Sequence, residues 1–72
     1  MSQYAKPVKR LRLKAEFEAA GLRTVKEISE ATKVKENTLH GILSGWRYPG
    51  SNVQGVFCET LGISIDRLRG LL

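Results

Sequence analysis

The apolar residues of this chain recur mostly three and four positions apart, which is the spacing of residues on one face of a helix. β-Branched residues are scattered, and the strict alternation of apolar and polar positions that is typical of strands is absent. The pattern therefore predicts an all-α fold, a compact bundle of about five short helices. With no repeat, low-complexity tract or dividing linker, we expect residues 1–72 to form one domain, with residues 1–6 as a flexible basic arm.

The first helix is expected to begin near Pro7, which a first helical turn tolerates, and to stop by Gly21, which suits the left-handed position after a helix end. Two apolar stripes compete for the core on this helix. One consists of Leu13, Phe17 and Ala20, and the other of Val8, Leu11, Ala15 and Ala19. Burial of the phenylalanine ring is worth about 1.5 to 3 kcal/mol, which favours the first stripe.

Thr24 and Glu27 have the spacing of a capping box and predict that a second helix begins there. It should end at about Thr32 and turn inward Val25, Ile28 and either Ala31 or Thr32. After a short connection, a third helix is expected from about Lys35 to Leu43, closed by Gly45.

The third helix has two different faces. Its core face holds Leu39, Ile42 and Leu43, and the opposite face holds Asn37, His40, Gly41 and Ser44, flanked by Glu36 and Thr38. A merely solvated helix face more usually carries lysine and glutamate, whereas these residues are short, hydrogen-bonding or without a side chain. Each is an ordinary exposed residue when taken alone, but together they predict a surface that contacts a partner.

Ser51 or Asn52 is expected to cap a fourth helix, which carries Val53, Val56, Phe57 and Leu61 and ends at Gly62. Cys58 is interpreted as a small buried filler. One or both of Trp46 and Tyr48 are expected to pack over the core beside Pro49, and the alternative is a phosphate contact through the Tyr48 hydroxyl or the Trp46 NH.

Ser64 is expected to cap a last helix, whose apolar residues exceed what a terminal turn can hide within one chain. We therefore predict a dimer contact, and the alternative is that this helix only closes the core. The expected contact residues are Leu68, Leu71 and Leu72.

Charge indicates an anionic partner. The 72 residues include 12 Lys and Arg against 7 Asp and Glu, a formal net charge of +5. The whole excess precedes the first acidic residue, Glu16, and lies at Lys6, Lys9, Arg10, Arg12 and Lys14. A basic segment of this kind can follow a phosphate backbone or dock an acidic protein. The lone Cys58 fits a reducing, cytoplasmic setting, and no apolar run approaches the roughly 20 residues of a membrane span.

Three segments in order resemble the helix-turn-helix family of lambda-type phage repressors and Cro proteins. The stretch 28–42 is similar to the two-helix core, with Ser29 where the helices cross and Val34 at the buried turn position. Residues 45–49 look like the family's loop after the recognition helix, and residues 61–68 look like its closing segment. Lys33 and Lys35 depart from the family, which usually has glycine at the turn and serine or threonine at the cap.

The resemblance implies operator binding as a two-fold dimer, with the third helix in the major groove. Asn can pair with the N6 and N7 edge of adenine, and a glutamate can accept from cytosine N4. The expected base-reading residues are Glu36, Asn37, His40 and Gly41. The expected phosphate-binding residues are Lys9, Arg10, Lys33, Lys35, Thr38, Ser44 and Arg47.

The sequence therefore predicts a sequence-specific regulator of transcription that binds double-stranded DNA, a repressor from a phage or mobile element. The alternative is a protein-interaction module, such as an antitoxin or antirepressor, that uses the same fold. An enzyme is not expected, because one histidine, one cysteine and no paired carboxylates supply no acid, base or nucleophile set. Neither a cofactor nor a metal site is expected.

Overall fold

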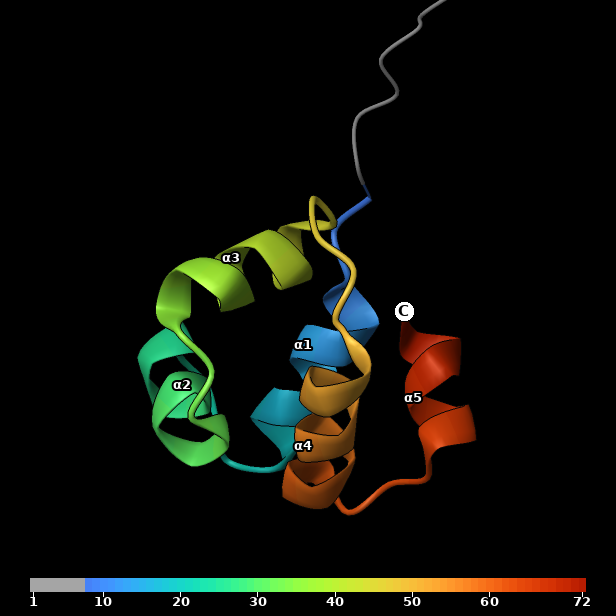
Figure 1. Cartoon of the computed structure of the whole chain (residues 1–72). Helices are drawn as coiled ribbons and strands as arrows, with labels where there is room; N and C mark the ends of the chain where they lie inside the picture. The colour runs from blue at the N-terminus through green and yellow to red at the C-terminus, as the bar shows by residue number, and fades with distance from the viewer. Residues whose placement is uncertain (1–7) are drawn as a thin grey trace, which may run out of the picture.

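The predicted all-α bundle of five short helices is confirmed by a computed structural model, which describes residues 8–72 (Figure 1). The helices are α1 (Leu11–Ala19), α2 (Val25–Thr32), α3 (Glu36–Ser44), α4 (Ser51–Leu61) and α5 (Ile65–Leu71). The arm expected at residues 1–6 and the helix start expected at Pro7 lie outside the described residues. Within them α1 begins later than predicted, because Val8 to Arg10 are not helical.

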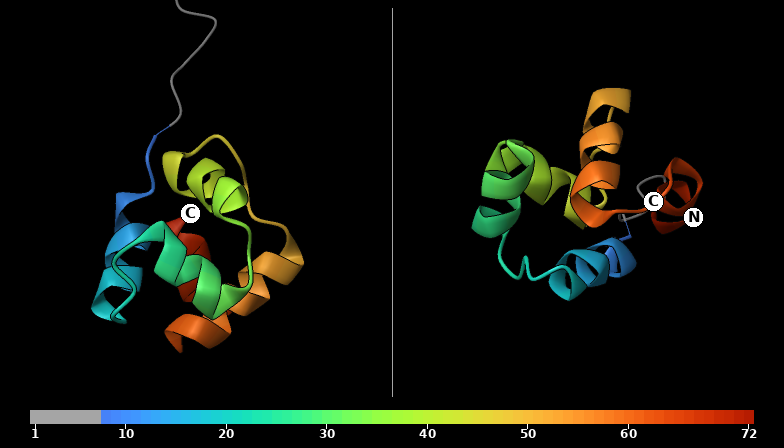
Figure 2. Two further views of the ribbon diagram at one scale, coloured as in Figure 1. Left: turned by 90° about the vertical axis from the view of Figure 1, so that its left-hand side faces the viewer. Right: turned by 90° about the horizontal axis from the view of Figure 1, so that it is seen from below.

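The five helices surround a shared core. Seen from below in Figure 2, α2 and α3 lie on one side, α5 lies on the other, and α1 and α4 lie between them. The packed pairs are α2 with α3 and α4, α1 with α3 and α5, and α4 with α5. This arrangement puts α3 at the edge of the molecule, where only its inner side is covered.

Two phenylalanines mark the centre of the core. The rings of Phe17 and Phe57 meet edge to face, with centroids 5.2 Å apart. The other core residues are Leu13, Ile28, Leu39, Ile42, Leu68 and Leu71. The choice between the stripes of α1 is thereby settled in favour of Leu13 and Phe17, although Ala20 of that stripe is exposed.

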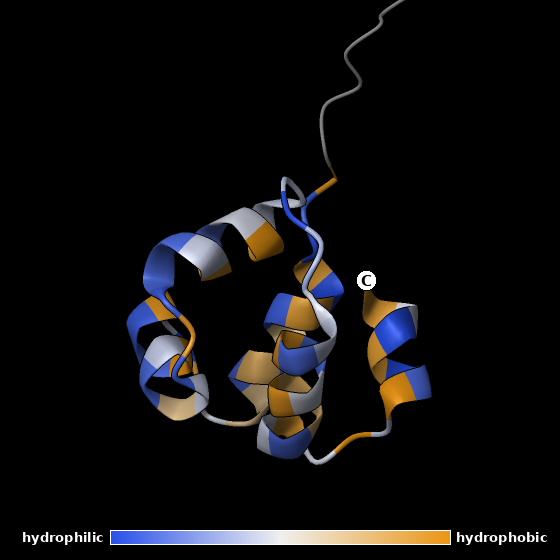
Figure 3. Cartoon of the chain, viewed as in Figure 1, coloured by the Kyte–Doolittle hydropathy of each residue, from blue (hydrophilic) through white to orange (hydrophobic). Residues whose placement is uncertain are grey.

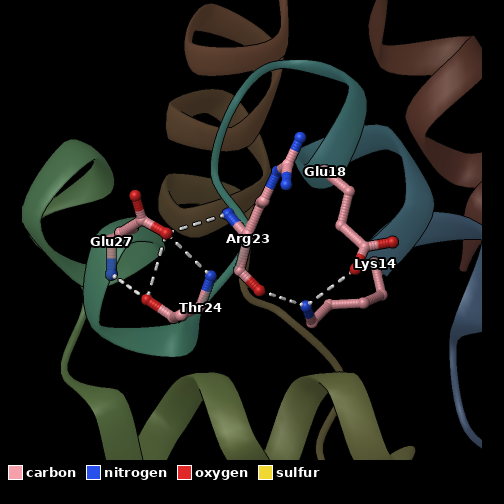
Figure 4. Close-up of polar contacts among 5 residues, drawn as sticks. All are labelled: Lys14, Glu18, Arg23, Thr24 and Glu27. Atoms are coloured by element: carbon pink, nitrogen blue, oxygen red, sulfur yellow. Dashed lines mark hydrogen bonds and ion pairs between the residues drawn. The ribbon is translucent and has the colours of Figure 1, made fainter.

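Local sequence signals set most helix ends as predicted. At the start of α2, the Thr24 hydroxyl accepts a hydrogen bond from the Glu27 amide at 3.1 Å, and the Glu27 carboxylate accepts one from the Thr24 amide at 3.1 Å (Figure 4). The side chain of Ser64 caps α5 by accepting from the amide of Arg67. Gly45 and Gly62 end α3 and α4 in left-handed conformations, with φ of 90° and 67°.

The start of α4 differs from the prediction. Gly50 occupies the cap position in an extended conformation and makes no side-chain cap bond, so Ser51 is already helical and Asn52 follows it. The side-chain Nε2 of the buried Gln54 instead donates to the carbonyl of Pro49 at 2.9 Å. Pro49 is itself fully buried and fixes the loop that enters α4.

The prediction for the last helix needs a correction. Leu68 is 0% exposed and Leu71 is 9% exposed, because both pack into the core of a single chain. Two of the three residues expected at a dimer contact therefore close the bundle instead, and only the half-buried Leu72 keeps part of its surface. No helix among residues 8–72 combines the length and apolar character that a membrane crossing requires.

Candidate nucleic-acid interface

Helix α3 exposes a polar surface along its first turns. Leu39 and Ile42 are buried and hold the helix on the core, so the residues on the opposite side face outward. Glu36, Asn37 and His40 are all exposed. Figure 3 shows hydrophilic colouring at the start of α3 and hydrophobic colouring near its end.

The connection from α2 to α3 places two lysines beside this surface. Lys33 adopts a left-handed conformation with φ of 63°, and Lys35 is the extended cap residue of α3 without a side-chain cap bond. Both side chains are exposed. The hydroxyl of Ser29 donates to the carbonyl of Val34 at 2.6 Å, and the side chain of Val34 packs against the core. A hydrogen bond and an apolar contact therefore both fix the connection. The amino end of α3 therefore has two exposed lysines beside it, and the dipole of the helix favours an anion there.

Gly41, a predicted base-reading residue, lies next to the side chain of Arg47. A Cβ at this position would lie 2.8 Å from Cδ and 2.9 Å from Cγ of Arg47, so the stem of that arginine covers the glycine. The turn at Gly45 brings the chain back, and the amide of Arg47 donates to the carbonyl of Gly41 at 3.0 Å. Arg47 therefore fills the space beside Gly41 in this structure.

Ser44 and Thr38 are half-buried. The Ser44 hydroxyl donates to the carbonyl of His40 at 2.6 Å and lies 3.2 Å from that of Gly41. The Ser44 hydroxyl is therefore bonded within α3 in this structure, and its predicted phosphate contact stays a prediction.

Arg10 has a structural role that the sequence did not reveal. Its amide donates to the carbonyl of Leu43 at 2.9 Å, and its guanidinium donates to the carbonyls of Ile42 and of Arg47. The carbonyls at a helix end have no partner within the helix, and a cation there is favoured. These bonds hold the guanidinium against the end of α3, and the predicted phosphate contact stays a prediction. Lys9, by contrast, is exposed.

Trp46 and Tyr48 do not pack over the core, contrary to the prediction. They are 75% and 66% exposed, and only Pro49 of this loop is buried. The Gly45 turn and the buried proline fix the two ends of the loop, so the residues between them project outward. Tyr48 meets the cation of Arg10, whose Cζ lies 5.8 Å from the ring centroid.

The structure thus brings together Glu36, Asn37 and His40 on one exposed surface, which we call the α3 amino surface, with Lys33 and Lys35 beside it. This surface offers amide, imidazole and carboxylate groups on a helix with cations at its start, and it can make hydrogen bonds in a polar groove. Comparisons with protein-family models, curated proteins and solved structures found no match to this chain.

Proposed function

We propose that this chain is a sequence-specific regulator of transcription that binds double-stranded DNA, a repressor of the lambda-type helix-turn-helix kind. The observation that carries the proposal is the α3 amino surface, which lies at the edge of the molecule with Lys33 and Lys35 at its border. The major groove admits one helix, and a recognition helix contacts base edges with its amino-terminal residues.

Each residue of the surface has a definite chemical task in this proposal. The Asn37 amide both donates to and accepts from the N6 and N7 edge of adenine, His40 bonds a second base edge, and Glu36 accepts from cytosine N4. Lys33 and Lys35 neutralise phosphates at one end of α3, and Arg47 and Lys9 do so at the other. The proposed setting is the cytoplasm, where two copies occupy the half-sites of an operator and exclude polymerase without any catalysis.

The test begins with selection of bound sites from random duplexes, followed by titration of the best site and a scrambled one. Asn37→Ala should weaken binding to the selected site by about 1 to 3 kcal/mol and should change binding to scrambled DNA far less. The matched control is Asn52→Ala, an exposed asparagine on α4, which should change neither.

A second substitution separates charge from base reading. Lys35→Gln should weaken binding to both duplexes equally and lower the slope of log affinity against log salt by about 1. If Asn37→Ala also acted equally on both duplexes, reading of bases by α3 would be refuted.

The exposed Trp46 and Tyr48 favour a second candidate, a protein-interaction module such as an antitoxin or antirepressor. Aromatic side chains are enriched in protein interfaces, and these two project from a loop fixed at both ends. That candidate requires that the purified chain retain no duplex in a salt-sensitive way.

A further inference from the structure

An apolar groove lies where three helices meet, next to the α3 amino surface. Its walls are formed by Leu11, Val25 and Leu43. Leu11 and Val25 are the first residues of α1 and α2, and Leu43 lies near the end of α3. Leu11 is 69% exposed, and Val25 and Leu43 are only partly covered by the core. Three apolar side chains from three helices therefore remain open to solvent at one place.

The groove is rimmed by cations. Lys9 is exposed there, Arg10 bonds only carbonyl oxygens, and neither pairs with a carboxylate among the described residues. The stem of Lys14 lines the groove, while its ammonium donates to the carbonyl of Arg23 at 2.7 Å and lies 3.5 Å from the carboxylate of Glu18 (Figure 4). No carboxylate from the described residues lines the groove.

The size of the groove limits what can occupy it. Its volume is about 250 Å³, which is below the roughly 300–1,000 Å³ of small-molecule sites. It can take one large apolar side chain but not a cofactor. Apolar walls with a cationic rim therefore match a segment in which one apolar residue stands among carboxylates.

We infer that this groove is a docking site for an acidic peptide segment of a partner protein, which inserts one apolar side chain between Leu11, Val25 and Leu43. His40 and Ser44 form the border of the groove toward α3, so the bound segment also covers part of the surface proposed to read DNA. The partner and a duplex then exclude each other. The docking itself is independent of DNA binding, and only this exclusion rests on the proposed function.

The docking is tested with three synthetic peptides, a glutamate-rich one with a single central leucine, the same peptide with serine for leucine, and the same peptide with lysine for each glutamate. Affinities are measured by fluorescence anisotropy, and the site is mapped from the methyl chemical shifts of the protein. The leucine peptide should shift Leu11, Val25 and Leu43, the serine peptide should bind about tenfold more weakly or worse, and the lysine peptide should not bind.

Leu11→Ser should weaken the leucine peptide to the level of the serine peptide. The matched control is Ile65→Ser, because Ile65 is also a partly exposed apolar residue at the first position of a helix. Lys9→Gln should weaken both acidic peptides, and Arg69→Gln on α5, an exposed arginine that does not line the groove, should leave them unchanged.

Several results would overturn the docking site. The leucine peptide could fail to bind, or could bind no better than the serine peptide. Leu11→Ser and Ile65→Ser could weaken the leucine peptide equally. The chemical shift changes could also be confined to the polar hollow between α1 and α5, which is lined by Arg12 and Arg67. Displacement of the leucine peptide by the selected duplex supports the exclusion, and simultaneous binding refutes it. If no duplex binds at all, the proposed function fails while the peptide measurements still decide the docking.

Discussion

The two halves of α3 differ in what surrounds them. In the amino half, residues 36–40, the side chains of Glu36, Asn37 and His40 are exposed. In the carboxyl half, residues 41–44, the stem of Arg47 covers Gly41 and the guanidinium of Arg10 bonds the carbonyl of Ile42. One short helix therefore combines an open surface at its amino end with a carboxyl end that its own chain covers at Gly41 and at the carbonyl of Ile42.

This difference indicates which half of α3 can contact a partner. An enclosed carboxyl half keeps the axis of α3 fixed on the core, and a fixed axis lets the amino half present its side chains in one geometry. In recognition helices the residues near the amino end contact the base edges. The proposed base contacts therefore concentrate on Glu36, Asn37 and His40 rather than extending along the whole polar face.

The enclosed half can be opened by removing the guanidinium of Arg10. Arg10→Met keeps the apolar stem but leaves the carbonyls of Ile42 and Arg47 without their charged donor. Bonds of this kind contribute about 1.5 to 3 kcal/mol, so we expect the free energy of unfolding in urea to fall by about 2 kcal/mol.

The control for this substitution is Arg12→Met, since Arg12 is an exposed arginine two residues further on, in the first turn of α1. A surface change of this kind should stay within about 0.5 kcal/mol. Equal stabilities of the two variants would mean that the guanidinium of Arg10 does not stabilise the end of α3. The difference between the two halves of α3 would then not depend on Arg10.

Features that depend on neighbours within one or two turns could be predicted from the sequence. The capping box of Thr24 and Glu27, the glycine at the end of α3 and the buried pair Leu39 and Ile42 all depend on local spacing, and the structure contains each of them. The exposed side of the amino half followed from the same helical period. Local physics therefore accounts for the five helices and for the open half of α3.

Features that depend on residues far apart in the sequence could not be predicted in this way. Arg10 bonds a carbonyl 32 positions further along the chain, and nothing in its neighbourhood in the sequence reveals that the end of α3 will lie beside it. Whether Leu68 forms a surface or a core depends on how closely α5 packs against α1 and α4. The enclosed half of α3 and the burial of the last helix both required the tertiary arrangement.

The connection that leads into the amino half of α3 can be tested by a substitution at Lys33. A residue other than glycine loses about 1 kcal/mol of stability in a left-handed conformation. Glycine avoids this loss, but its greater freedom in the unfolded chain offsets part of the gain. Lys33→Gly should therefore raise the free energy of unfolding by about 0.5 to 1 kcal/mol, while the loss of its charge weakens binding to both duplexes alike.

The control is the same substitution at Lys26, which is exposed within α2 and has a helical backbone. Lys26→Gly should lower stability by a similar amount, because glycine is a poor helix former. A loss of stability in both variants would contradict the left-handed conformation at Lys33 and the geometry of the connection into α3.

The smallest expected effect tests whether Arg47 really closes the carboxyl half. Alanine is favoured over glycine inside a helix by up to about 1 kcal/mol, but a methyl group at Gly41 must displace the stem of Arg47. Gly41→Ala should therefore stabilise the chain more in an Arg47→Ala background, with a coupling of about 0.5 kcal/mol in a double-mutant cycle. Gly55→Ala on α4, where an added Cβ meets nothing within 4 Å, should gain equally in both backgrounds. Equal gains at Gly41 would show that the arginine leaves the glycine open, and base contacts would then extend along the whole face of α3.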